Sequence, residues 1–308
     1  MSKATIKKLS LAAGAFLASL VFGYLFKNFI TLPGTGNLIW VFIGAVFLLS
    51  TFLLQTILAG DKRLSPLSIV LESLGMSAFF FGGFSVILAI GMLLGLSLFL
   101  MAYYAGASEI KNDLEIHFSK ISRAVMRLAT MGVALFASFA YVGSFNLKSP
   151  VDAKQKLEVL VKPVEPIVAR YVPNFSSKSN LKEIAAQILP ADLKLASETQ
   201  KNEAIAQISS RLADTLTNSV GVRVAPMDRV IDILYKASIG RMLTLTPLLQ
   251  NLILIVLGLI FFLFIKFLLL FVDWGATLLG YGFYALLKTF GFFKIELQNV
   301  PKRVIILE

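Results

Sequence analysis

The sequence SETQKNEAIAQISSRLADTLTNSVG, residues 197–221, belongs to the one long stretch of the chain whose composition suits water. That stretch, residues 147–241, holds 14 of the 29 Lys and Arg residues and 10 of the 18 Asp and Glu residues, but only three aromatic residues. On both sides of it, runs of Leu, Ile, Val, Ala, Gly and Phe are long enough to cross a bilayer. The sequence therefore predicts a polar domain held between two membrane blocks.

Helical signals recur throughout the polar stretch and predict an all-helical domain. Residues 198–219 carry apolar side chains at helical spacing, and Gly221 follows as a stop. Asn180 to Glu183 resembles a capping box at the start of a helix that Pro190 ends. Pro226, with Asp228 in the first turn, is expected to open another helix. A further apolar stripe, which prolines at 163 and 166 must kink or split, consists of Leu157, Leu160, Val161, Val164, Val168 and Tyr171.

The N-terminal membrane block, residues 1–146, is expected to hold five membrane-embedded elements. Residues 66–105 are too many for one helix across a hydrocarbon core of about 30 Å, and Gly82-Gly83 lies near their middle. An amphipathic helix over residues 106–127, whose polar face carries the lone histidine, His117, is expected to run into the last span. The expected elements are spans near residues 9–30, 38–59, 84–104 and 128–146, with a shorter or re-entrant element near 66–81.

The C-terminal membrane block, residues 243–308, begins with the most hydrophobic run of the chain. It predicts a span near residues 244–272, a membrane interface at Asp273-Trp274, and a second span or an interfacial helix over residues 275–293, before a short tail. The predicted fold is thus an all-α, polytopic membrane protein. It has about six to seven membrane-embedded helical elements and one small all-helical soluble domain inserted between two membrane blocks.

Basic residues beside the apolar runs predict the orientation through the positive-inside rule. Lys residues precede the first span, Asp61-Lys62-Arg63 follows the second, and the amphipathic segment carries Lys111, Lys120, Arg123 and Arg127. The tail is basic as well, with Lys288, Lys294, Lys302 and Arg303. We therefore expect an integral protein of the cell membrane with a cytoplasmic N-terminus and an extracytoplasmic polar domain.

The composition argues against most enzyme and cofactor classes. Cysteine is absent and His117 is the only histidine, so one chain cannot supply thiolate ligands or two histidine ligands to a metal. No phosphate-binding Gly-x-x-x-x-Gly-Lys-Ser/Thr loop occurs. The net charge of +11 is placed largely beside lipid headgroups, so it does not indicate nucleic-acid binding. We expect no catalytic residues, no cofactor and no metal.

Two groups of residues within the apolar runs are candidate sites. Ionisable side chains inside a membrane are functional candidates by default, and here they are Glu72, Lys266 and Asp273. Glu72 could bind a cation, carry a proton, or pair with Lys27 or Lys266. Gly91 and Gly95 form a GxxxG pattern, and Gly83 lies on roughly the same face, which predicts close helix packing within the chain or between copies.

Two functional classes fit these patterns. The first is a non-enzymatic scaffold, assembly or interaction protein, which contacts the lipid bilayer and another membrane or envelope protein through its helical domain, or a second copy of itself. The alternative is a transporter or channel, whose path is lined by the elements of residues 66–104 and by Glu72.

Overall fold

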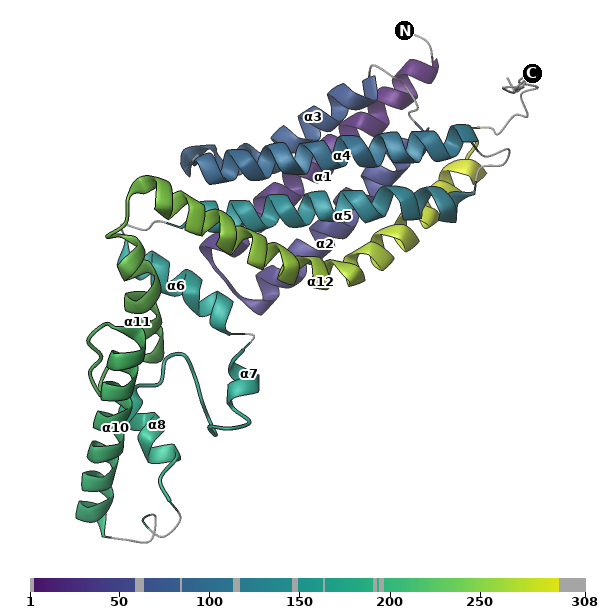
Figure 1. The fold of residues 1–308 in the computed structure, drawn as a ribbon. Coiled ribbons are helices and arrows are strands. Elements are labelled where there is room, and N and C mark those ends of the chain that lie inside the picture. Colours follow the sequence, from purple (N-terminus) through teal and green to yellow (C-terminus); the bar gives the residue numbers. More distant parts are fainter. Residues whose placement is uncertain are drawn as a thin grey trace, which may run out of the picture. The chain divides into compact units, whose positions relative to one another are not determined.

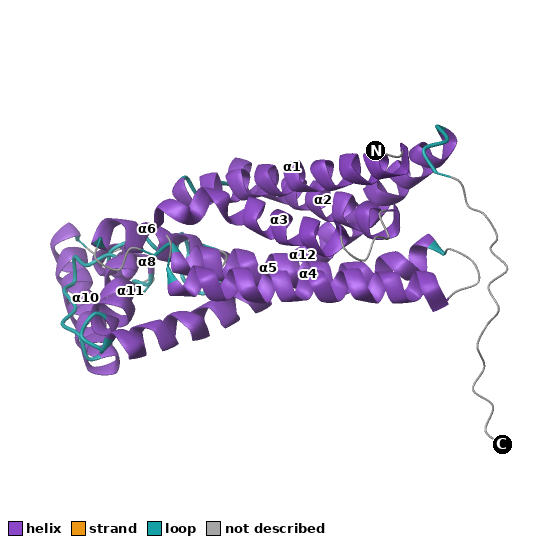
Figure 2. Ribbon diagram, turned by 90° about the horizontal axis from the view of Figure 1, so that it is seen from above, coloured by secondary structure: helices purple, strands orange, loops and turns teal. Residues whose placement is uncertain are grey.

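The computed structural model describes residues 3–58, 64–83, 85–112, 117–145, 149–162, 164–190, 193 and 197–293. Over these residues the regular structure is helical (Figures 1 and 2), and the β-structure is limited to a single bridge between Asn180 and Arg229. The prediction of an all-α protein is confirmed. Several expectations rest on residues that lie outside the described ones. These are Asp61-Lys62-Arg63, Leu147-Lys148, Pro163, and the tail residues Lys294, Lys302 and Arg303.

Six helices in the described part of the chain are long and apolar enough to cross a membrane. The protein is therefore an integral membrane protein. The six are α1 (Lys3–Thr31), α2 (Thr35–Leu58), α3 (Leu64–Ser77) with its 3-10 extension η1 (Ala78–Gly83), α4 (Val86–Asn112), α5 (Phe118–Gly143) and α12 (Pro247–Thr289).

The chain divides into two compact units. The first, here the bundle unit, comprises residues 1–84, 89–138 and 261–308, and the second, here the polar unit, comprises residues 85–88 and 139–260. The polar unit includes the whole of the predicted polar stretch, together with the end of α5 and the start of α12. Its short elements are α6 (Pro150–Val161), α7 (Glu165–Val168), α8 (Leu181–Gln187), α10 (Glu198–Val220), α11 (Val230–Tyr235) and the π-helix η2 (Lys236–Gly240).

In the bundle unit, α1 packs against both α2 and α3. The face that α3 buries is composed mainly of small residues: Ser65, Ser68, Ser73, Gly75 and Ser77, with Glu72 among them. A Cβ atom at Gly23 of α1 would overlap the backbone carbonyl oxygen of Met76, and one at Gly75 would overlap the hydroxyl of Ser19. Because neither residue has a side chain, the backbones of α1 and α3 come into direct contact.

The polar unit is built from helices whose ends the sequence marks clearly. Asn180 and Glu183 form a reciprocal capping box at the start of α8, and Ser197 and Gln200 form another at the start of α10. Gly221 ends α10 in the left-handed conformation, at φ 66°. A small core joins these helices, with Leu181, Ala213, Val224 and Ile233 buried and Ile184 and Leu216 packed against them.

The expectation of two elements in the C-terminal block is wrong, because α12 runs unbroken through Asp273-Trp274 for 43 residues. No proline interrupts residues 248–289, and apolar residues continue on both sides of Asp273. The helix ends only where Gly291 adopts a φ of 67°. At 1.5 Å per residue it is about 65 Å long, roughly twice the thickness of a hydrocarbon core.

Three smaller expectations also need correction. Residues 106–127 are not one helix, because α4 ends at Asn112 and the exposed His117 precedes the start of α5. The helix expected from Pro226 starts at Val230, because the side chain of Asp228 accepts a hydrogen bond from the Ala225 amide (3.0 Å) and holds a turn there. The apolar stripe after Leu157 is divided between α6 and α7, and its second half is not buried.

Candidate functional site

Glu72 lies at the centre of a buried polar cluster between α2 and α3. Its side chain is only 2% exposed. The amide nitrogen Nε2 of Gln55 donates to the hydroxyl of Ser68 (2.7 Å), which in turn donates to Oε1 of Glu72 (3.0 Å). Ser65, Ser68 and Glu72 share one face of α3 because they are three and four residues apart. The sequence pointed to Glu72, but gave no sign that Gln55 of the preceding helix would meet it.

Three oxygen atoms of this Glu72 cluster have no hydrogen-bond partner among the residues that the structure describes: Oε1 of Gln55, the hydroxyl of Ser65 and Oε2 of Glu72. An acceptor that is buried without a donor is costly in a low-dielectric interior. A proton on Glu72 would turn Oε2 into a donor, and a cation beside the carboxylate would offset its charge. Chemically, the Glu72 cluster can therefore take up positive charge.

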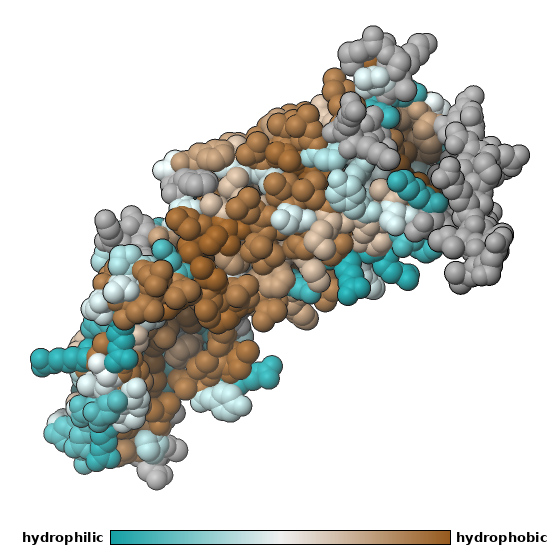
Figure 3. Space-filling view, turned by 45° about the horizontal axis from the view of Figure 1, so that its top comes forward, coloured by the Kyte–Doolittle hydropathy of each residue, from teal (hydrophilic) through white to brown (hydrophobic). Residues whose placement is uncertain are grey.

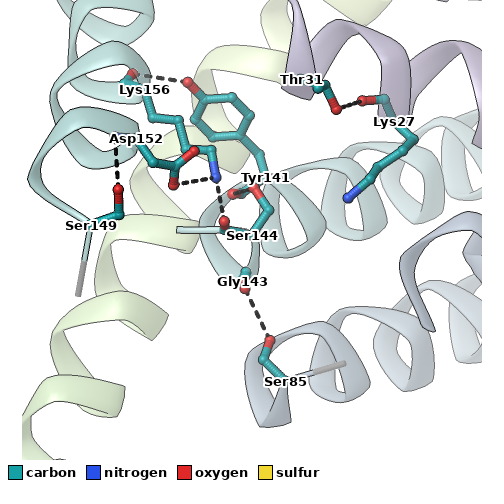
Figure 4. Close-up of polar contacts among 9 residues, drawn as sticks. All are labelled: Lys27, Thr31, Ser85, Tyr141, Gly143, Ser144, Ser149, Asp152 and Lys156. Atoms are coloured by element: carbon teal, nitrogen blue, oxygen red, sulfur yellow. Dashed lines mark hydrogen bonds and ion pairs between the residues drawn. The ribbon is translucent and has the colours of Figure 1, made fainter. Parts of the chain in front are cut away.

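The structure does not bring Glu72 together with either lysine considered as its partner. Among the described residues, Glu72 forms no ion pair with Lys27 or Lys266. The ammonium of Lys27 lies 5.4 Å from the centroid of the Phe80 ring, while its backbone carbonyl accepts a hydrogen bond from the Thr31 hydroxyl (2.9 Å; Figure 4). The ammonium of Lys266 lies 6.0 Å from the centroid of the Phe262 ring.

Lys266 and Asp273 instead line one groove between α5 and α12, within the bundle unit. The groove has a volume of about 1060 Å³. Arg123 and Arg127 of α5 line it as well, so three cationic side chains and one carboxylate face the same space. The sequence suggested both arginines as orientation signals, and their meeting with α12 could be seen only in the fold. Figure 3 shows that hydrophobic residues dominate the visible surface of the long helices.

The glycines of the predicted pattern lie on α4 and at the end of η1. Gly91 and Gly95 are both buried on α4, and a Cβ atom at Gly95 would lie 3.3 Å from the carbonyl oxygen of Gly132 on α5. Gly83 ends the 3-10 segment η1. The tighter contact, between Gly23 and α3, was not predicted, because a single glycine in α1 has no partner in the sequence pattern.

The polar unit contains a second buried polar cluster, shown in Figure 4. The hydroxyl of Tyr141, near the end of α5, donates to the carbonyl oxygen of Lys156 on α6 (2.9 Å). Lys156 is only 6% exposed. Its ammonium donates to the Ser144 carbonyl and pairs with Asp152 (2.9 Å). These bonds fasten α6 to the end of α5. The polar groups that Figure 4 shows around Lys156 are paired with one another, so this cluster stabilises the fold of the polar unit.

No group of three or more His, Asp or Glu side chains that could hold a metal occurs among the described residues. No family model, no curated protein and no solved structure matches the chain.

Proposed function

We propose that this protein is a non-enzymatic, multi-pass component of the cell membrane that contacts another membrane or envelope protein through its polar unit, as a scaffold or assembly factor. The observation that supports this function is an exposed apolar surface around α7. Val164, Ile167 and Tyr171 are 47%, 57% and 82% exposed, and α7 buries none of its own residues. We refer to these three residues as the α7 surface.

The α7 surface has the arrangement of a contact site for a protein. Its residues follow one another by three and four positions, which favours one side of the segment. Arg170 and Glu165 add charged groups around this apolar centre, as is common at protein interfaces. Burying these apolar side chains inside the polar unit would stabilise its fold. Apolar side chains that stay exposed together are typical of an interaction site.

The backbone under the α7 surface is held in place from within the polar unit. Oε1 of Glu165 accepts a hydrogen bond from the Ser177 amide (2.7 Å), and Lys178 pairs with Glu158 (2.9 Å). Burial acts to raise the pKa of Glu165, but the hydrogen bonds from Ser177 and the charges of Lys162 and Lys178 outweigh it, so its pKa lies below the ordinary value. A segment fixed in this way loses little conformational freedom when it binds.

The orientation that we propose has the N-terminus in the cytoplasm and the polar unit outside. Five spans before the polar unit and one after it return the end of α12 to the side of the N-terminus. In the bundle unit the Lys7 ammonium donates to the carbonyl oxygen of Phe292 (2.6 Å), which supports this arrangement. The basic residues near α1 and at the start of α5 favour the cytoplasm for that side.

A photo-activatable amino acid at position 171, in place of Tyr171, tests the proposed function in native membranes. We expect one protein adduct of defined mass, which an added Ile167→Asp substitution removes. The same probe at Asn202, an exposed position on α10, is the matched control. Adducts of the same pattern from both positions, or adducts with lipid alone at position 171, would contradict a protein partner.

A transporter is the second candidate function, and the three unpartnered oxygens of the Glu72 cluster favour it. The test is ion or proton flux across liposomes that contain the purified protein, compared with the Glu72→Gln variant. Flux that requires the carboxylate would establish transport. Equal flux in the two proteins would remove the Glu72 cluster from any transport path.

A further inference from the structure

We propose that the groove between α5 and α12 is a binding site for an anionic phospholipid, with the phosphate held by Arg123 and Arg127 and an acyl chain along the apolar wall. This inference does not depend on the proposed function, since it concerns the bundle unit alone. The groove's shape, its charge and the carboxylate of Asp273 in its lining carry it.

The groove is too large and too apolar for a small anion. Its volume of about 1060 Å³ lies at the upper end of the range for ligand pockets. Met131, Leu269, Leu270 and Leu278 provide an apolar wall beside the charged groups. Trp274, which is 81% exposed, and Tyr281 also line it, and these are the residue types that gather at headgroup level. An amphiphile with a charged head and an apolar tail matches this pairing.

The charges of the groove favour an anionic headgroup. Arg123 and Arg127 are one turn apart on α5, and both are exposed. Neither forms a salt bridge with any residue that the structure describes. With Lys266 they give three positive charges against the single carboxylate of Asp273. Two adjacent guanidinium groups offer planar, bidentate donors to a phosphate, which is the geometry that arginine supplies better than lysine.

The side chain of Asp273 further restricts which headgroup the groove can bind. It is only partly buried and lines the groove, so its carboxylate can accept a hydrogen bond from a ligand there. A phosphate alone brings a second negative charge toward this carboxylate, whereas a headgroup that carries a hydroxyl beyond its phosphate can donate to it. Phosphatidylglycerol has this chemistry, while phosphatidate has no such hydroxyl and phosphatidylcholine has neither a hydroxyl nor a net negative charge. We therefore infer that phosphatidylglycerol binds in preference to both.

The membrane, rather than the aqueous phase, is the source of this ligand. The groove is formed by two of the helices that are apolar enough to span the bilayer. On α12 the residues beside it, among them Leu263, Phe267 and Phe271, are exposed and apolar, as lipid-facing residues are. A lipid can therefore enter sideways, with its phosphate at the level of the arginines.

The position of Trp274 allows a direct test, because the chain has only two tryptophans. In a Trp40→Phe variant, Trp274 is the sole tryptophan and reports on the groove. The protein is placed in vesicles whose lipids carry bromine on the acyl chains, a quencher of tryptophan fluorescence. At equal bromine content, we expect phosphatidylglycerol to quench Trp274 with an apparent affinity roughly five-fold or more above that of phosphatidylcholine.

Variants and a second tryptophan locate the effect. We expect the double substitution Arg123→Gln and Arg127→Gln to abolish the preference, and Lys288→Gln, which removes a cation of α12 outside the groove, to leave it unchanged. A Trp274→Phe protein, in which Trp40 reports instead, should show no preference. In Asp273→Asn, the discrimination between phosphatidylglycerol and phosphatidate should fall.

Three outcomes would overturn the proposal. The first is equal quenching of Trp274 by brominated phosphatidylglycerol and phosphatidylcholine in the protein with both arginines, a comparison that needs no groove variant to fold. The second is a preference that survives the loss of both arginines. The third is the same preference in the Trp274→Phe protein, where Trp40 reports, since the effect would then not belong to the groove.

Discussion

The contact between α1 and α3 and the contact between α5 and α12 differ in how closely the helices approach. At the first, Gly23 and Gly75 let the two backbones touch, and the polar side chains between α2 and α3 are sealed in. At the second, arginine, lysine and tryptophan side chains line a groove of about 1060 Å³ between the helices. Within one bundle, small residues close a helix pair, while long cationic side chains leave a groove.

Because the two helix pairs approach to different distances, their polar atoms have different hydrogen-bond partners within reach. Polar atoms at the closed contact can be satisfied only by one another, so one missing donor affects the whole Glu72 cluster. Polar atoms at the open groove can be satisfied by a ligand from outside. The predictions below test this contrast, beginning with the substitution that should disturb the protein most.

Filling the closed contact should have the largest effect. In Gly23→Ala, the new methyl group would overlap the backbone carbonyl of Met76, so α1 and α3 must move apart. We expect a loss of about 3 kcal/mol in stability, seen as a marked fall of the thermal unfolding temperature in detergent. Gly14→Ala in the same helix is the control, because nothing lies within 4 Å of its added carbon. Equal unfolding temperatures for the two variants would mean that α1 and α3 do not touch there.

The sequence predicted the helices well and their partners poorly. The lengths of apolar runs predicted where the six long helices lie, although α5 begins at Phe118 rather than near residue 128 and α12 ends at Thr289 rather than near residue 272. Asn180 and Gly221 mark helix ends through bonds to their own neighbours. Gly23, Gln55 and Arg127 have roles that depend on the helix lying opposite, which no local pattern encodes. The break expected at Asp273-Trp274 was wrong because neither residue interrupts a helix: no proline lies in residues 248–289, and apolar residues continue on both sides of Asp273.

Removing the acceptor at the centre of the Glu72 cluster should have the next largest effect. Glu72→Leu leaves the hydroxyl of Ser68 without its acceptor, although that hydroxyl can still accept from Gln55, and the loss should cost about 2 kcal/mol. Glu72→Gln keeps an acceptor and adds a donor for the unpartnered oxygen of Gln55, so we expect a change within about 0.5 kcal/mol of the parent. Thermal unfolding of the two variants measures the difference, and Ser97→Ala, which removes an exposed intrahelical hydrogen bond, is the control.

An intermediate case is the contact of Gly95 with Gly132, which is close but not overlapping. A Cβ atom at Gly95 would lie 3.3 Å from the Gly132 carbonyl oxygen and 3.4 Å from Cβ of Phe136. Because a shift of a few tenths of an ångström relieves this, we expect Gly95→Ala to cost about 1 kcal/mol, and Gly95→Leu to cost more. Gly282→Ala, with open space around the new carbon, is the reference in the same unfolding assay. A Gly95→Leu protein as stable as its parent would show that α4 and α5 are not in contact at this level.

The ion pair of Asp228 with Lys236 tests how much a charge contributes to folding stability outside both helix contacts of the membrane. Its Oδ2 accepts from the Lys236 ammonium (2.7 Å) and the Ala225 amide (3.0 Å). Burial acts to raise its pKa, but these bonds and the charges of Lys236 and Lys154 outweigh it, so the pKa lies below 3.8. A lowered pKa stabilises the folded state above pH 3.8, and this stabilisation is lost as the pH falls through the folded value.

The substitution Asp228→Asn isolates the charge, because its amide oxygen can still accept from Ala225. We expect a loss of at most about 1 kcal/mol at pH 7, since Lys236 is 43% exposed and solvent screens the pair. Hydrogen–deuterium exchange over residues 225–236 measures it as lower protection in the variant. The difference should shrink below pH 3.8, and Asp214→Asn on α10 should show none. A deficit that stays constant down to pH 2 would mean that the charge of Asp228 does not stabilise this turn.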